Sequence, residues 1–333
     1  MRGVIAAFRG SSRSVTTFGY FLSSEEHPPS SLVEQAVRAE QAGFDALWIS
    51  DHYHPWNDAQ GQSPFVWSVL GGIAARTERV RCYTAVTAPT VRIHPAVIAQ
   101  AAATTQVMFD GRFGLGIGSG EALNEHIFGD AWPTADVRLE MLEEAVEVMR
   151  QLWTGDVVRH QGKHYTVDTA RIYTLPPQGV PVLVSGFGEK ATALAAKIGD
   201  GYVTTSPDKE LVDLYRKNGG KGPAQAGVKV CWAADKAVAR KTVHRLWANS
   251  ALPGEAAQVL PSPQHFEQLS ELVTEDQAVE GKPCGPDVAD FVDAVKKYVD
   301  AGIDEIYLSQ MGHDQDGFFR FWESELKDAL ADL

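Results

Sequence analysis

The sequence alternates between two hydrophobic periodicities along almost its whole length. Short apolar runs rich in β-branched and aromatic residues are each followed by a longer run with apolar residues at helical spacing. This alternation predicts repeated β-α units around a parallel sheet. The strand candidates are Val15–Phe21, Phe44–Ile49, Val80–Val86, Arg112–Ile117, Val182–Ser185, Gly201–Thr204, Val228–Trp232 and Glu305–Ser309. Eight strands are what a (β/α)8 barrel requires, so the predicted fold class is α/β, with the architecture of a TIM barrel.

A doubly wound sheet is the alternative arrangement for alternating strands and helices. That fold usually has fewer strands and carries a glycine-rich fingerprint after its first strand, and no such fingerprint follows Phe21. We therefore predict one barrel over residues 15–333, preceded by a disordered extension over residues 1–14. Two segments interrupt the alternation: a hairpin inserted at about residues 155–180 and a helical lid at about residues 249–287.

The composition argues against several classes of partner. The chain has 30 Lys and Arg against 43 Asp and Glu, a net charge of −13, which is unsuited to gripping nucleic acid or an anionic membrane. No apolar run approaches the roughly 18 residues of a membrane helix, and the start of the chain lacks a signal-peptide pattern. The three cysteines are widely spaced and indicate reduced thiols. We therefore expect a cytoplasmic protein that acts on a small molecule.

The second predicted strand runs into a loop of polar and aromatic residues, Ser50-Asp51-His52-Tyr53-His54-Pro55-Trp56. Reactive groups of a β/α barrel lie at the C-terminal ends of its strands, so this loop is a candidate active-site segment. His52 could act as a general base near neutral pH, and Trp56 could donate its indole N–H to a developing anion. The alternative interpretation is structural, with Asp51 as a cap and the aromatic residues packed around the loop.

The His-x-His pattern in this loop also resembles half of a barrel metal site. Metallohydrolases of this fold place such a pair after the first strand and add ligands from later strand ends. Here the fifth to seventh predicted strands end in Ser185-Gly186, Thr204-Thr205 and Trp232-Ala233, none of which supplies a ligand set. We therefore predict no bound metal.

The fourth predicted strand carries glycines on one face. Side chains alternate along a strand, so Gly114, Gly116 and Gly118 share a face. Glycine weakens a strand, which indicates that another group needs the space, either a flat polycyclic ligand or the crowded interior of the barrel. Glu121 follows where this strand ends, and Asn124 lies one helical turn later. A carboxyl between apolar walls would have a raised pKa and could hold a proton for delivery.

The turn after the fifth predicted strand is Gly186-Phe187-Gly188-Glu189-Lys190, and a helix is expected from Ala191. Free backbone N–H groups at such a turn bind anions. Phosphate-bearing ligands often bind at barrel turns of this kind, so the segment is a candidate anion site.

Several segments together resemble the luciferase-like superfamily of flavin and deazaflavin barrels, and within it the coenzyme F420-dependent glucose-6-phosphate dehydrogenase family. These segments are SDHYHPW, TAVTAPT followed by RIHPAVIAQ, GLGIGSGEALNE, MRQLWTGD and AAKIGDGYVTTS. The likeness extends from about Thr17 to Leu330 and is weakest between Arg216 and Asp287. It implies that the cofactor is the deazaflavin F420, whose C5 exchanges a hydride with a carbon of the substrate.

The resemblance also implies roles for individual residues. His52 matches the catalytic base, Trp56 the residue that stabilises the anion, and Glu121 the proton donor to the deazaflavin. The positions that match cofactor contacts are Asp51, Ala85, Val86, Ala88, Asn124, Phe187, Gly188, Lys190 and Ala191. A non-proline cis peptide bond is implied between Ala85 and Val86. Two matches are incomplete, because the family's glycine pair is Phe187-Gly188 here and a cofactor-contacting threonine is Ala88.

The substrate side departs further from the family. The threonine at the end of the sixth strand is kept as Thr205, but the lysine that binds the sugar phosphate falls on Asp208, with Lys209 one place along. A carboxylate reverses the sign of that contact. The departure disfavours glucose 6-phosphate and favours an uncharged sugar, an alcohol or a hemiacetal.

We therefore predict an F420-dependent oxidoreductase that acts on a CH–OH group of a small molecule. The first alternative is an FMN-dependent monooxygenase on the same barrel. The second is a non-catalytic F420-binding protein that has lost its substrate site, which the change at Asp208 permits. Because relatives are typically homodimers, the resemblance also implies a homodimer.

Overall fold

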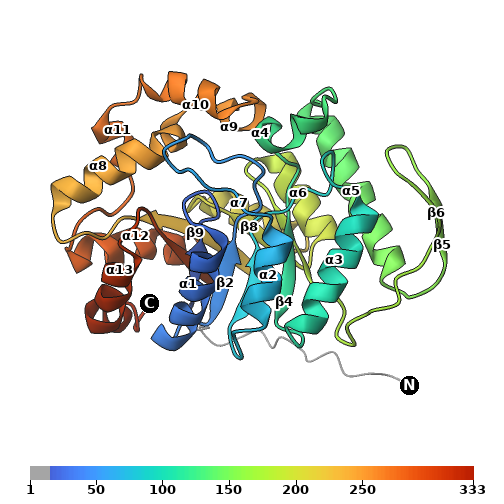
Figure 1. Cartoon of the computed structure of the whole chain (residues 1–333), viewed down its shortest axis with the longest axis horizontal. Helices are drawn as coiled ribbons and strands as arrows, with labels where there is room; N and C mark the ends of the chain where they lie inside the picture. The colour runs from blue at the N-terminus through green and yellow to red at the C-terminus, as the bar shows by residue number, and fades with distance from the viewer. Residues whose placement is uncertain (1–15) are drawn as a thin grey trace.

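A closed barrel of eight parallel strands forms the centre of the molecule, and helices surround it (Figure 1). The computed structural model describes residues 16–333, so the predicted extension over residues 1–14 lies outside the described residues. Around the barrel the strand order is β1-β10-β9-β8-β7-β4-β3-β2, and β1 pairs with both β10 and β2. The predicted (β/α)8 barrel is confirmed.

Every predicted strand overlaps an observed one. The barrel strands are β1 (Thr17–Leu22), β2 (Ala46–Ile49), β3 (Arg81–Thr84), β4 (Phe113–Ile117), β7 (Val182–Ser185), β8 (Gly201–Thr204), β9 (Ala224–Val230) and β10 (Glu305–Gln310). The largest difference is at β9, which begins four residues before the predicted Val228. The first half of β9 does not read as an apolar run in the sequence, because it contains the polar residue Gln225. Gln225 is nevertheless buried, and its amide accepts a hydrogen bond from Trp48 and donates one to Glu305.

Amphipathic helices cover the outside of the barrel. The longer ones are α1 (Pro29–Ala42), α2 (Val66–Ala74), α3 (Pro95–Met108), α5 (Ala135–Leu152), α6 (Glu189–Ile198), α7 (Lys209–Lys217), α8 (Lys236–Trp247), α12 (Val288–Asp300) and α13 (Gln315–Phe321). The single helix predicted over Gln315–Leu330 is divided, because a π-helical turn at Trp322–Leu326 separates α13 from the short α14 (Lys327–Ala329). None of the helices within residues 16–333 is long and apolar enough to span a membrane.

The glycine face of β4 points into the barrel. Phe113, Leu115 and Ile117 pack in the apolar layer between strands and helices, whereas Tyr83, Trp48 and Tyr307 belong to the interior cluster. A Cβ on Gly114 would lie 2.5 Å from the Tyr83 ring, and one on Gly116 would overlap the carbonyl oxygen of Thr84. Gly118 alone of the three lines the cavity described below. The ligand interpretation is therefore wrong for Gly114 and Gly116, which make room for the crowded barrel interior.

Two insertions leave the barrel pattern. The antiparallel hairpin of β5 (Val158–Gln161) and β6 (Thr166–Ala170) extends beyond α5 in Figure 1, within the segment predicted to hold a hairpin. The second insertion contains α9 (Ala256–Val259), α10 (Pro263–Ser270) and α11 (Glu275–Val279), which lie together with α8 over one end of the barrel. Apolar side chains of α8 pack against this segment in a cluster separate from the main core.

Candidate active site

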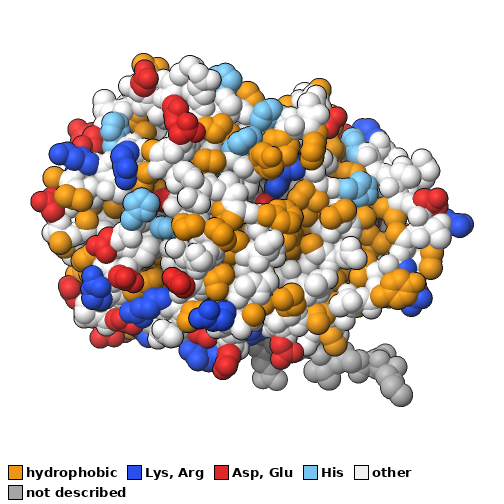
Figure 2. Space-filling model, viewed as in Figure 1, with side chains coloured by type: hydrophobic (Ala, Val, Ile, Leu, Met, Phe, Trp, Pro, Cys, Tyr) orange, Lys and Arg blue, Asp and Glu red, His pale blue; other side chains and the backbone are white. Residues whose placement is uncertain are grey.

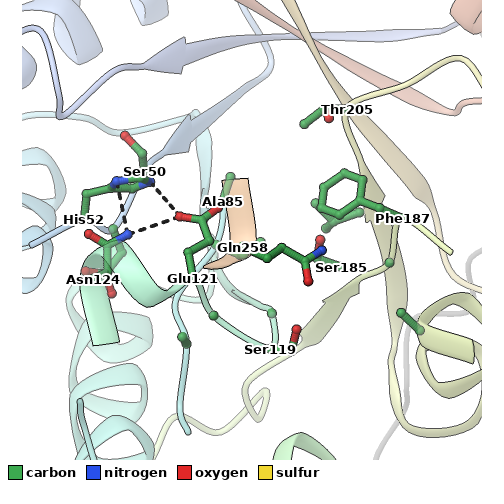
Figure 3. Close-up of a pocket in the computed structure, with 18 of the residues that line it drawn as sticks. Ser50, His52, Ala85, Ser119, Glu121, Asn124, Ser185, Phe187, Thr205 and Gln258 are labelled. Atoms are coloured by element: carbon green, nitrogen blue, oxygen red, sulfur yellow. Dashed lines mark hydrogen bonds and ion pairs between the residues drawn. The ribbon is translucent and has the colours of Figure 1, made fainter. Parts of the chain in front are cut away.

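A cavity of about 690 Å³ opens where the barrel strands end. Its walls come from the segments after β1, β2, β3, β4, β7 and β8, and the second insertion contributes Gly254, Glu255 and Gln258. Figure 2 shows the molecule from the side of the barrel, with basic side chains between apolar ones near the centre of the view. Figure 3 shows the cavity from inside, with His52 and Glu121 facing one another and Phe187 on the opposite wall.

His52, Glu121 and Asn124 form a contact network at one end of the cavity (Figure 3). His52 Nε2 lies 3.7 Å from Glu121 Oε2, and the Asn124 side-chain amide donates a hydrogen bond of 3.2 Å to the same carboxyl. The other ring nitrogen, Nδ1, lies 3.1 Å from the carbonyl oxygen of His54. The same nitrogen lies 3.2 Å from the Asn124 side-chain nitrogen, and Nε2 is the ring nitrogen that faces the Glu121 carboxyl. Sequence reasoning placed these three residues together correctly.

Asn124 holds the loop after β2 in addition to its hydrogen bond with Glu121. Its side-chain oxygen accepts hydrogen bonds from the backbone N–H groups of Tyr53 and His54, at 2.9 and 3.2 Å. Asn124 lies in α4 (Ala122–Glu125), directly after the glycine-rich end of β4. One side chain therefore joins the β2 and β4 loops and sets the position of His52 relative to Glu121.

Glu25 is a residue beside His52 that sequence reasoning missed. Its Oε1 lies 3.4 Å from His52 Nε2, and its Oε2 accepts hydrogen bonds from Ser50 at 2.6 Å and Ser23 at 3.0 Å. Burial alone would raise the pKa of Glu25, but the charge of His52 and the two serine hydroxyls outweigh burial and lower that pKa. Glu25 in its charged form thus places a negative charge directly against the His52 ring.

The pKa of Glu121 is shifted in the opposite direction from that of Glu25. About a third of the Glu121 side chain, 32%, is accessible, and that part faces the cavity. Burial raises its pKa first, and the nearby negative charges of Glu25 and Glu125 raise it further, against the opposing effect of His52. Two carboxyls therefore flank one imidazole with pKa values shifted apart, the arrangement that separates an acid from a base. The predicted raised pKa of Glu121 is confirmed.

Lys229, a half-buried lysine near the end of β9, adds a positive charge at this end of the cavity. It lines the cavity, and its Nζ lies 4.4 Å from the ring centroid of Trp247, over the indole face. Burial lowers its pKa, while Glu25, Glu26 and Glu121 act to raise it. Glu26 lies behind Trp247 and accepts its indole N–H at 2.7 Å, and burial raises the pKa of this carboxyl to about 7.

Trp56 and Asp51 occupy different environments although they belong to one loop. The Trp56 ring lies 5.1 Å from that of His52 and lines the cavity, and Phe266 of α10 packs edge-on against it. Asp51 is buried, with Arg92 at 2.9 Å from one carboxyl oxygen and the Thr87 hydroxyl at 2.8 Å from the other. Its carboxyl is thus held by protein partners, while the residue still lines the cavity.

The positions predicted to contact a cofactor all lie on the cavity wall. Ala85, Val86 and Ala88 follow β3 on one side, and the Ala85–Val86 peptide bond is cis, as the family resemblance implies. Phe187, Gly188, Lys190 and Ala191 line the end formed by the start of α6. Gly188 is the N-cap of α6 and offers no side-chain acceptor, so the first N–H groups of this helix remain available to an anion.

The three predicted substrate residues separate in the structure. Thr205 lines the cavity after β8. Asp208 caps α7 instead, accepting hydrogen bonds from the backbone N–H groups of Glu210 and Leu211, and Lys209 pairs with Asp213 at the surface. Asp208 and Lys209 lie outside the cavity lining, because the turn after Thr205 leads the chain away into α7.

No group of three or more His, Cys, Asp or Glu side chains within residues 16–333 is arranged to hold a metal ion. His54, the second half of the His-x-His pattern, directs Nδ1 to the carbonyl oxygen of Leu123 at 2.8 Å rather than toward His52.

The sequence of residues 11–310 matches the family model described as luciferase-like monooxygenase. The chain belongs to the luciferase-like family. Curated members include the F420-dependent glucose-6-phosphate dehydrogenase of Microbacterium testaceum (strain StLB037), 38% identical over 326 residues that cover 94% of this chain and 97% of that protein. The corresponding enzyme of Nakamurella multipartita is 36% identical over 95% of this chain and 97% of its own length.

Solved structures show the same barrel. An F420-dependent secondary alcohol dehydrogenase, determined with an F420-acetone adduct, superposes with a TM-score of 0.86 at 31% identity and covers 92% of this chain and 97% of its own. The coenzyme F420-dependent tetrahydromethanopterin reductase of Methanopyrus kandleri has a TM-score of 0.75 at 19% identity, over 95% of this chain and 99% of its own, which shows likeness of fold.

The missed members of the site left little signal in the sequence. Glu25 lies in a polar Ser-Ser-Glu-Glu run that looks like an ordinary loop, and Lys229 is a single cation inside an apolar strand. Each lies at the end of its own strand, and β1 pairs with β10, which pairs with β9. The rule that barrel sites lie at strand ends could have selected both residues.

Proposed function

We propose that this protein is an F420-dependent oxidoreductase that acts on a CH–OH group of a small molecule. The observation that carries the proposal is the position of His52 between two carboxyls, Glu25 and Glu121, whose pKa values are shifted in opposite directions. The relatives named above support the choice of cofactor, because an F420-dependent enzyme among them is 38% identical over 94% of this chain.

The residues present fit a deazaflavin nucleotide. A long cavity of about 690 Å³ leads from the acid–base end, past small side chains at Ala85, Ala88 and Gly118, to the start of α6. The small residues leave room for a flat ring, and the first turn of α6 offers N–H donors for a phosphate. When bound, F420 supplies a deazaflavin ring that exchanges a hydride with the substrate carbon.

The protein side chains would handle the protons of this reaction. His52 Nε2 accepts the proton of the substrate hydroxyl, and Glu25 holds the resulting imidazolium. Glu121, whose pKa is raised, would hold a proton at its carboxyl and donate it toward the bound cofactor. Trp56 packs beside His52 and presents its indole to the oxygen that becomes anionic. Asn124 keeps the base and the acid at their present separation, and Asp51 orients the loop that carries His52.

The substrate is proposed to be an alcohol, hemiacetal or sugar that carries no phosphate. Thr205 is available on the cavity wall, whereas Asp208 and Lys209 face away from it. The F420-dependent secondary alcohol dehydrogenase among the solved relatives supports a simple alcohol. We also propose that the enzyme works as a homodimer in the cytoplasm, as the family resemblance and the three free, buried cysteines suggest.

The cofactor assignment is tested by titrating the purified protein with oxidised F420 and, separately, with FMN, following ligand fluorescence. We expect clear preference for F420, and a preference for FMN would replace the proposal by the monooxygenase alternative. A panel of secondary alcohols, sugars and sugar phosphates, followed by loss of F420 absorbance, then tests the reaction. Tight F420 binding without turnover on any member would favour a non-catalytic F420-binding protein.

A further inference from the structure

Arg138, in the first turn and a half of α5, is a buried cation on the cavity wall that the mechanism above does not use. Only 3% of the residue is exposed, and it lines the cavity. The guanidinium stacks over the Trp132 ring at 4.5 Å, which covers one face. Its Nη1 donates to the carbonyl oxygen of Pro133 at 2.7 Å and its Nη2 to the side-chain oxygen of Gln258 at 2.8 Å.

The Nε donor of Arg138 has no acceptor within residues 16–333. Its buried Nε lacks a hydrogen-bond partner, and no carboxylate within residues 16–333 lies within the 4.0 Å of an ion pair with this guanidinium. Burial lowers the pKa of Arg138, with partial compensation from the charge of Glu255. A buried guanidinium with neutral partners is costly, and an anion in the cavity would offset that cost.

The surroundings of Arg138 suit an anion. The first turns of α5 and α6 both line this end of the cavity, and no side chain caps either helix. Both helices are at least ten residues long, and their N-terminal ends direct partial positive charge toward the same space. The carboxyls at this end of the cavity are either paired with a lysine or exposed to solvent. Asp136 pairs with Lys190 at 2.7 Å, and Glu189 and Glu255 are exposed.

We infer that Arg138 binds an anionic group of the F420 side chain, either the phosphate or a carboxylate of the lactyl-glutamyl tail. The inference rests on the proposed cofactor and adds a residue to it, on a helix separate from the α6 turn. Gln258 is the neutral partner that shares the guanidinium, so the second insertion contacts the ligand site through this pair. Arg138 therefore determines how strongly the protein distinguishes the charged cofactor from its uncharged deazaflavin core.

The test compares three ligands by fluorescence titration: F420 with its glutamyl tail, F420 without glutamates, and the deazaflavin riboside that lacks the phosphate. We expect the wild-type protein to prefer F420 over the riboside. Arg138→Met should reduce this preference by at least about tenfold and leave the affinity for the riboside within about twofold. If the loss appears only with the glutamyl form, Arg138 binds a tail carboxylate. If it appears also with the form without glutamates, Arg138 binds the phosphate or the lactyl carboxylate.

Lys197→Met is the matched control. Lys197 pairs with Glu143, so it joins α5 and α6 as Lys190 does, but outside the cavity lining. Its removal should leave the ligand preference unchanged. The preference is a ratio of two affinities measured on the same variant, so partial unfolding of Arg138→Met does not alter it. Arg138→Lys keeps the positive charge and should retain part of the preference for F420. Equal weakening of F420 and riboside in Arg138→Met, or a wild-type protein without preference, would overturn the inference. Failure of the wild-type protein to bind any of the three would instead overturn the cofactor assignment and the inference with it.

Discussion

The two ends of the cavity differ in how they hold charge. At the His52 end, Glu25 and Glu121 lie within 4 Å of one imidazole, and the exposed fractions are 11% for the His52 side chain and 5% for that of Glu25. At the α5–α6 end, Lys190 and Asp136 form an ion pair whose side chains are 75% and 68% exposed. Arg138 is the exception at that end, because it is buried and has no carboxylate partner among residues 16–333.

This difference suits the two ends of the cavity to different tasks, proton transfer at the His52 end and ligand binding at the α5–α6 end. Buried charges interact strongly and shift each other's pKa values, which suits proton transfer. Exposed charges are screened by water and salt, so they contribute little individually and act mainly on the affinity for a charged ligand. Changes at the His52 end should therefore alter turnover, and changes at the α5–α6 end should alter cofactor binding.

The largest effect is expected from His52→Ala. Loss of the base should lower turnover at least about a hundredfold, because general base catalysis contributes about that much. The dissociation constant for F420, measured by fluorescence, should stay near the wild-type value. His265→Ala, which changes a histidine on the surface helix α10, is the control and should leave turnover unchanged. A His52→Ala variant with near-normal turnover would remove this residue from the mechanism.

Glu121→Gln should cost a similar factor and also change the pH dependence. As a proton donor Glu121 acts in its protonated form, so wild-type turnover should fall as the pH rises through its raised pKa. Glutamine cannot titrate, so the variant should lose turnover at least about a hundredfold and lack this alkaline decline. A pH–rate profile with the same decline in wild type and variant would assign that ionisation to another group.

Glu25→Gln tests whether the buried carboxylate positions the base. The variant keeps the size of the side chain but loses the charge that faces His52 Nε2, and we expect turnover to fall at least about tenfold with little change in F420 affinity. The acidic limb of the pH–rate profile should also change, because the wild-type protein loses the Glu25 charge as the pH falls through the lowered pKa of that carboxyl, whereas glutamine does not titrate. A loss confined to thermal stability, with an unchanged profile, would show that Glu25 is structural.

The smallest effect is expected at the other end of the cavity. Lys190→Met removes the cation of an exposed ion pair, so the free energy of unfolding should change by less than about 1 kcal/mol. The dissociation constant for F420 should rise a few-fold at low salt and converge with wild type at high salt. A loss of turnover at saturating F420 would contradict the proposed separation between the two ends.

Several features of the fold were predictable because they depend on local pattern. The alternation of strands and helices, the hairpin around residues 158–170 and the placement of His52 and Glu121 at strand ends follow from periodicity and from the rule for barrel sites. The start of β9 was wrong by four residues, because Gln225 is a buried polar residue that only its partners Trp48 and Glu305 make compatible with the interior.

The role of the β4 glycines could not be predicted from the β4 sequence alone. Their shared face was predictable, but whether a ligand or a neighbouring ring fills the space depends on β3, and Tyr83 and Thr84 decide this for Gly114 and Gly116. Asp208 is similar, because the residue reads as a substrate position in sequence while its side chain caps α7.

The sequence alone determined the barrel, its strand ends and the two residues most suited to acid and base chemistry, because these depend on short-range periodicity and residue type. Only the tertiary structure decided that Glu25 faces His52, that Lys229 lines the same cavity, and that Arg138 is buried with no carboxylate partner in the described part of the chain. These contacts join residues far apart in the chain, and they exist because closing the barrel brings the ends of all its strands to one rim.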